Sequence, residues 1–155
     1  MTEITITLNK EAVYEEVSQT TSYMGTKSSK GENYDTVFTT EEDSNMLERF
    51  WNESKNTICN SIKKFILEET EVTGTYMIKL QVPDLFDKAL ADSIHRSLFS
   101  YFVLSITSKW NSLFSKELGA GTMIEVAVHV DAIKRILYHR KRPVRTLAIQ
   151  PYEYE

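Results

Sequence analysis

The chain has a single cysteine, Cys59, among its 155 residues, so an internal disulfide framework is excluded. Only three prolines and five glycines are present, which favours long regular elements over loops. No stretch approaches the roughly 18 consecutive apolar residues of a membrane-spanning helix, and the N-terminus lacks the features of a signal peptide. We therefore expect one domain, residues 1–155, with its own hydrophobic core and no membrane segment.

Common signatures of catalysis and cofactor binding are also missing. The sequence contains no phosphate-binding loop, no dinucleotide-binding glycine motif and no nucleophile elbow. The three histidines, His95, His129 and His139, share no metal-ligand spacing. Cys59 falls within an apolar helical period, which is typical of a packed thiol rather than a nucleophile. We expect no enzyme activity, no cofactor, no metal and no small-molecule substrate.

Alternating and helical spacings of apolar residues predict three strands and four helices. Asn9 is placed to cap the first helix, and Thr40 with Asp43 makes a capping-box-like start for the second. Gly74 predicts a turn, and Gly119-Ala-Gly121 predicts a break between the last two helices. In chain order, the expected elements are strand Thr2–Leu8, helix Lys10 to about Met24, helix Thr40 to about Glu69, strand Thr75–Val82, helices at about 84–118 and 122–142, and strand Thr146–Gln150.

The expected fold class is α+β, mainly α. Two helices of about 30 residues would each be roughly 45 Å long, too long for a compact sphere of this size. We therefore expect an elongated bundle of about four helices, with a small sheet built from short strands at both termini and in mid-chain. Residues 25–39 lack periodicity and predict a flexible loop or arm, and residues 151–155 predict a short tail.

Positive charge is concentrated between Ile133 and Arg145, in a chain whose formal net charge is −4. The dipole of a helix C-terminus favours a few cations, but it does not account for the whole run. Three explanations are open: docking on an acidic protein surface, contact with a nucleic-acid backbone, and a solvated helix end. The candidate partner-docking residues are Lys134, Arg135, His139, Arg140, Lys141, Arg142 and Arg145.

The helical layout from Thr40 to Leu118 and the ending Arg135-Ile-Leu-Tyr-His-Arg-Lys-Arg-Pro-Val-Arg145 resemble small neck proteins of tailed bacteriophages. The similar proteins are head–tail connector, or ring, proteins of phages that infect Bacteroidetes, including crAss-like phages. The resemblance implies a non-enzymatic structural protein of the virion, assembled in the host cytoplasm. It also implies a homo-oligomeric ring of twelve copies that docks on the portal or a neighbouring ring, and contacts other neck proteins, through the cationic helix end and the terminal strands. The predicted strands depart from the simplest all-helical connectors.

A different class of function uses the same basic run. Residues 134–145 are also typical of a nucleic-acid-binding or regulatory module, because Lys and Arg clusters contact phosphates without reading the base sequence. The aromatic residues that interleave with cations in many nucleic-acid grooves are missing, since only Tyr138 is nearby. Non-specific contact with a DNA backbone is therefore the alternative to protein docking.

Overall fold

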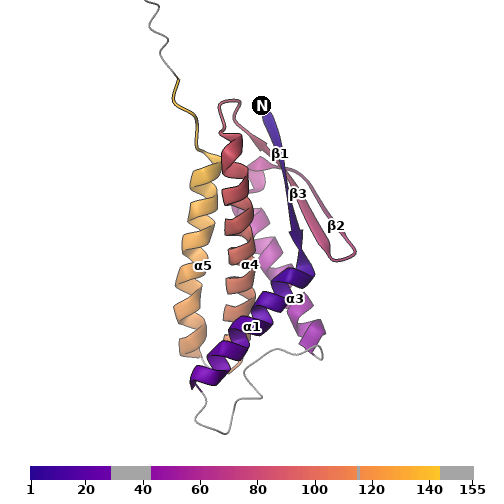
Figure 1. Ribbon diagram of the computed structural model, residues 1–155, viewed down its shortest axis with the longest axis vertical. Helices are drawn as coiled ribbons and strands as arrows, with labels where there is room; N and C mark the ends of the chain where they lie inside the picture. Colours follow the sequence, from indigo (N-terminus) through magenta and orange to yellow (C-terminus); the bar gives the residue numbers. More distant parts are fainter. Residues whose placement is uncertain (29–42, 115, 144–155) are drawn as a thin grey trace, which may run out of the picture.

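The computed structural model describes residues 1–28, 43–114 and 116–143, with the backbone alone for residues 24–28 and 118. In chain order, its elements are β1 (Thr2–Asn9), α1 (Lys10–Ser28), α3 (Ser44–Ser61), the short 3₁₀ helix η2 (Lys63–Phe65), β2 (Ile66–Val72), β3 (Thr75–Val82), the 3₁₀ helix η3 (Lys88–Leu90), α4 (Ala91–Ser112) and α5 (Lys116–Leu137). Figure 1 shows α4 beside α5, with α1 crossing obliquely and the sheet along the other side. The predicted class, α+β and mainly α, is confirmed.

The three strands form an antiparallel sheet in the order β1-β3-β2. Its buried face carries every second residue of β1 and β3, and this face packs on the helices. The hairpin between β2 and β3 turns at Thr73 and Gly74, whose φ angles are 36° and 76°. Two successive positive φ angles match the twist of a two-residue hairpin. The predicted strand at Thr75–Val82 and the turn at Gly74 are confirmed.

Asn9 caps α1 as predicted. Its Oδ1 accepts hydrogen bonds from the backbone N–H groups of Glu11 at 2.9 Å and Ala12 at 3.3 Å. The helix runs on to Ser28, so the loop predicted to begin at residue 25 is wrong for residues 25–28. The rest of the predicted arm, residues 29–39, lies outside the described residues, as does Thr40.

The helix predicted to reach Glu69 ends much earlier, because α3 stops at Ser61. Ile62 and Phe65 continue its apolar spacing and are buried, but the backbone between them turns through η2. The chain then enters β2, which pairs with β3 and satisfies its backbone groups in the sheet. Tertiary pairing therefore overrides the helical pattern.

The boundary predicted between the last two helices is also wrong. α4 ends at Ser112 and α5 starts at Lys116, so Gly119 and Gly121 lie inside α5 rather than at a break. α5 ends at Leu137 instead of Arg142. The strand predicted at residues 146–150 and the tail at 151–155 lie outside the part of the chain that the structure describes.

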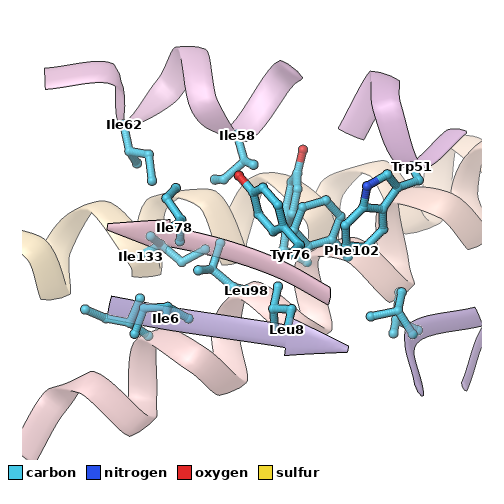
Figure 2. Close-up of a cluster of buried hydrophobic side chains, with 14 of the residues drawn as sticks. Ile6, Leu8, Trp51, Ile58, Ile62, Tyr76, Ile78, Leu98, Phe102 and Ile133 are labelled. Carbon is cyan, nitrogen blue, oxygen red and sulfur yellow. The ribbon is translucent and has the colours of Figure 1, made fainter. Parts of the chain in front are cut away.

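The core is centred on Trp51, which is fully buried and stacks on Phe102 with ring centroids 4.2 Å apart (Figure 2). Tyr76 meets Trp51 edge-on at 5.8 Å. Two buried hydroxyls, those of Ser54 and Ser105, form a 2.7 Å hydrogen bond that joins α3 to α4. α4 contacts α1, α3, α5 and β1, so it is the central helix of the fold.

Candidate functional site

The basic run begins where α5 is anchored on the core. Ile133 and Leu137 are fully buried, so the helix turns its polar residues outward at this end. The backbone N–H of Tyr138 donates to the Lys134 carbonyl at 3.2 Å, and that of His139 donates to the Ile136 carbonyl at 3.0 Å. These bonds close the last turn, after which the chain continues without regular structure to residue 143.

Lys141 binds this extension to the loop after β3 through a hydrogen bond and an ion pair. Its backbone N–H donates to the Leu85 carbonyl at 2.8 Å, and its Nζ lies 3.3 Å from Asp87 Oδ1. Asp87 also accepts a hydrogen bond from the backbone N–H of Ala89, at 3.1 Å. This hydrogen bond, together with the Lys141 ammonium, lowers the pKa of the Asp87 carboxyl group. The residues on either side of Lys141 are therefore held at a fixed place on the surface.

The fold brings a second basic segment to the same end of the bundle. Lys63 and Lys64 lie in η2, and Lys64 Nζ is 4.2 Å from the centroid of the Tyr138 ring. The Tyr138 ring packs edge-on against Phe65, with centroids 5.1 Å apart. The sequence pattern does not single out these two lysines, because it predicts them within the last turns of a long helix. Only the tertiary contact with Tyr138 reveals their position.

We call this surface the cationic end, and all but one of the predicted docking residues can be placed on it. Lys134 is half-buried and the others are exposed. Lys141 is the one cation among these described residues that forms an ion pair. Arg145 lies outside the described residues. The cationic end consists of Lys63, Lys64, Lys134, Arg135, His139, Arg140, Lys141 and Arg142.

A shallow hollow of about 290 Å³ adjoins the cationic end. Arg140 lines it together with Pro83, Asp84 and Leu85, and the N-terminal ammonium of Met1 pairs with the Asp84 carboxylate. Leu85 is 56% exposed and Tyr138 is 52% exposed. The surface therefore combines cations that form no ion pair with any described residue, except Lys141, with accessible apolar and aromatic groups. Arginine and aromatic residues are enriched in protein–protein interfaces.

The thiol of Cys59 lies in a small polar cluster with Glu69 and Tyr76. Its Sγ donates to Glu69 Oε2 at 2.9 Å and lies 3.3 Å from the Tyr76 hydroxyl. Burial, with the nearby Glu69 carboxylate, raises the pKa of the Cys59 thiol to about 11. At neutral pH the thiol is protonated, which is unsuited to nucleophilic attack.

We expect Cys59 of the folded protein to react with Ellman's reagent at pH 8 about 100-fold more slowly than in denaturant. The reason is that each unit of pKa lowers the thiolate fraction tenfold. Glu69→Gln removes the carboxylate and should speed the reaction of the folded chain. Equal rates for native and denatured protein would contradict this prediction.

A second polar cluster surrounds Lys10, which is buried with only 8% of its surface exposed. Its Nζ donates to both carboxylate oxygens of Glu48, at 2.8 and 2.7 Å, and to Glu71 Oε1 at 2.7 Å. The Tyr14 hydroxyl donates to Glu48 at 2.7 Å, and Lys55 Nζ lies 2.9 Å from the other Glu71 oxygen. This network ties the start of α1 to α3 and β2.

The ionisation of the network follows from these contacts. Burial by itself would lower the pKa of Lys10, but its hydrogen bonds to Glu48 and Glu71 outweigh burial and raise it. Burial would raise the pKa values of both carboxyl groups, yet the hydrogen bonds from Lys10 and its neighbours lower them. All three groups are therefore charged at neutral pH, and the network holds the fold together.

The described ranges hold no group of three or more His, Cys, Asp or Glu side chains arranged to bind a metal ion. Among the described helices, none is long and apolar enough to cross a bilayer. An open groove of about 270 Å³ lies between α1, α4 and α5, with Glu16, Phe99 and His129 among its lining residues.

Comparison with protein-family models, with curated proteins and with solved structures finds no match to this chain. The cationic end, built from the C-terminus of α5 and from η2, is therefore the candidate functional site of the described residues.

Proposed function

We propose that this chain is a non-enzymatic structural assembly protein that docks through its cationic end on an acidic surface of a partner protein. The observation that carries the proposal is a fixed surface on which exposed apolar groups lie beside cations, most of which form no ion pair with a described residue. Arg140 and Arg142 are exposed on either side of Lys141, which the fold holds in place. Guanidinium groups bind carboxylates through paired hydrogen bonds, so this surface suits an acidic partner.

The assembly we propose is the neck of a tailed-phage virion. There, copies of the chain would form a ring that meets the portal or a neighbouring ring. The resemblance of Thr40–Leu118 and Arg135–Arg145 to connector proteins motivates this proposal. The exposed Leu85 and Tyr138 favour a protein partner over a nucleic-acid backbone, because phosphates offer no apolar surface to cover them.

Charge reversal at the cationic end tests this function. We expect Arg140→Glu with Arg142→Glu to give a folded chain that no longer enters heavy particles, because the reversed charges would repel an acidic partner. The chain is expressed in the native source lacking the wild-type copy, and density-gradient fractions are assayed for it. Arg49→Glu with Lys116→Glu makes the same change in charge at the opposite end of the bundle and should leave assembly intact.

Two outcomes would contradict the docking role. If the double mutant enters particles as well as the control does, the cationic end is not the docking surface. If the purified wild-type chain instead binds duplex DNA, with an affinity that falls by a slope of about 0.9 per phosphate against the logarithm of salt concentration, the surface is a nucleic-acid contact. Loss of that binding in the double mutant would assign it to the same residues.

A further inference from the structure

The outward face of α5 carries a stripe of exposed residues with an apolar centre. Ile124 is 71% exposed and Val128 is 62% exposed, which is unusual for two neighbouring apolar side chains on one helix face. Figure 1 shows α5 at one edge of the molecule, with α4 beside it. We call this face the α5 stripe, and it consists of Glu117, Gly121, Ile124, Val128, Asp131 and Arg135, all exposed.

The charges at the two ends of the stripe have opposite sign. Eighteen residues separate Glu117 from Arg135, which is about five full turns, so both side chains lie on the same side of α5 roughly 27 Å apart. Neither forms an ion pair with any residue that the structure describes, and both are available to a partner.

The stripe is also symmetric about Val126. Glu117 and Arg135 are equally far from this position, as are Gly121 and Asp131, and Ile124 and Val128. Val126 itself is buried on the other side of α5, so it marks only the level of the crossing. When two copies of such a helix lie antiparallel and their stripes cross at this level, each acidic end meets the basic end of the other copy. A parallel arrangement would set Glu117 against Glu117 and Arg135 against Arg135. The charge pattern therefore selects the antiparallel arrangement.

We propose that the α5 stripe docks on the α5 stripe of a second copy of this chain, antiparallel and about a twofold axis that passes between Ile124 and Val128. Ile124 covers Val128 of the second copy, and Glu117 pairs with Arg135 of the second copy at both ends. Gly121 has no side chain, which lets the two helices approach closely. One helix face is smaller than a standard protein interface, so the association is weak and depends on protein concentration.

This inference does not rest on the proposed function. A twofold contact uses the same patch on both copies, whereas neighbours within a ring meet through two different patches. The two proposals share only Arg135, and they are measured in different ways. Self-association is a property of the purified chain, and docking needs the acidic partner.

Sedimentation equilibrium of the full chain, over a wide range of concentration, tests the proposal. We expect a monomer–dimer equilibrium that Ile124→Asp abolishes. Glu117→Arg and Arg135→Glu should each weaken the dimer about tenfold, because each sets like charges together at both ends of the contact. The double variant Glu117→Arg/Arg135→Glu exchanges the two ends and should restore the wild-type dissociation constant.

Circular dichroism and thermal melting of every variant establish that the monomer is folded, which the exposure of these residues leads us to expect. Arg140→Glu/Arg142→Glu serves as the control and should dimerise like the wild type. A wild-type chain that stays monomeric at all concentrations overturns the proposal. A double variant no better than the single variants also overturns it, since another surface then makes the contact.

Discussion

Replacing Lys10 by methionine is expected to destabilise the fold by roughly 2–3 kcal/mol, between the cost of breaking a surface ion pair and that of removing one partner from a fully buried pair, because the Glu48 side chain is 46% exposed and the Glu71 side chain 25% exposed. The variant leaves Glu48 and Glu71, both within 2.8 Å of the lost ammonium, without their shared cation. Methionine fills a similar volume, so the change tests charge more than packing. Urea unfolding followed by tryptophan fluorescence gives the free energy of unfolding at pH 7.

An exposed lysine provides the matched control. Lys79 lies on the outer face of the sheet, where its side chain is 40% exposed and pairs with Glu3 at 2.8 Å. Because water screens that pair, Lys79→Met should cost much less than Lys10→Met. Similar costs for the two variants would show that the Lys10 network contributes no more than an ordinary surface ion pair.

The network also predicts how stability changes with pH. The pKa values of Glu48 and Glu71 are lowered in the folded chain, so their contribution is present above the unfolded value of about 4.3 and is lost as pH falls through the folded values. The pKa of Lys10 is raised in the folded chain, so its pH dependence runs the other way. Its contribution to stability is complete below about pH 10.4 and is lost as pH rises through the folded value.

In Lys10→Met, the two carboxylates lose the cation that lowered their pKa values. Among the described residues, Glu48 then has no cation beside it, whereas Glu71 keeps its ion pair with Lys55. Protonation of Glu48 relieves an unpaired charge instead of breaking a pair, so acid should destabilise this variant less than it destabilises the wild type. We therefore expect the difference in the free energy of unfolding to shrink as pH falls from 7 through about 4.3 and below. A difference that stays constant over this range would mean that lost packing, rather than lost charge, causes the effect.

Features that depend on neighbouring residues could be predicted from the sequence. The period-2 alternation of β1 and β3 gave both the strands and their buried face, because one side of this sheet packs on the helices. Asn9 gave the start of α1, since its carboxamide bonds backbone N–H groups two and three residues further on. Such signals need no knowledge of the rest of the fold.

Features that depend on distant contacts could not be predicted in this way. The apolar spacing of Ile62, Phe65 and Ile66 is equally compatible with a helix, and only the pairing of β2 with β3 makes it the end of α3 and the start of a strand. For the same reason, Lys63 and Lys64 were not predicted to be part of the candidate site. The basic run could be predicted because its residues are consecutive in the sequence. The complete cationic end could not, because it also includes the lysines of η2.

The break predicted at Gly119 and Gly121 is wrong for a related reason. Glycine in a helix interior costs about 1 kcal/mol relative to alanine, so two glycines so close together indicate a break. Gly119 instead sits where α5 meets α4, and its carbonyl accepts a 2.9 Å hydrogen bond from the Ser108 hydroxyl. Close approach of the two helices explains the small residue at this position.

Replacing Gly119 by valine is accordingly expected to destabilise the fold by about 3 kcal/mol, at the upper end of the usual cost of overpacking. An added Cβ would overlap Ser112 Oγ and would lie 3.0 Å from Ser112 Cβ and 3.2 Å from the Ser108 carbonyl oxygen. Rotating the Ser112 hydroxyl away would break its 2.8 Å hydrogen bond to Ser108 and still leave the other two contacts. The helices must therefore move apart.

Gly121→Val separates this packing effect from helix propensity. A Cβ at Gly121 meets nothing within 4 Å, so the same substitution two residues away changes only the conformational preference of the chain. It should alter the free energy of unfolding by less than about 0.5 kcal/mol. Urea unfolding of both variants is compared at low protein concentration, where the α5 stripe is unoccupied. Equal changes in the free energy of unfolding at the two positions would mean that α4 and α5 can separate at Gly119 without loss of stability. A larger change at Gly119 measures how tightly the two helices pack.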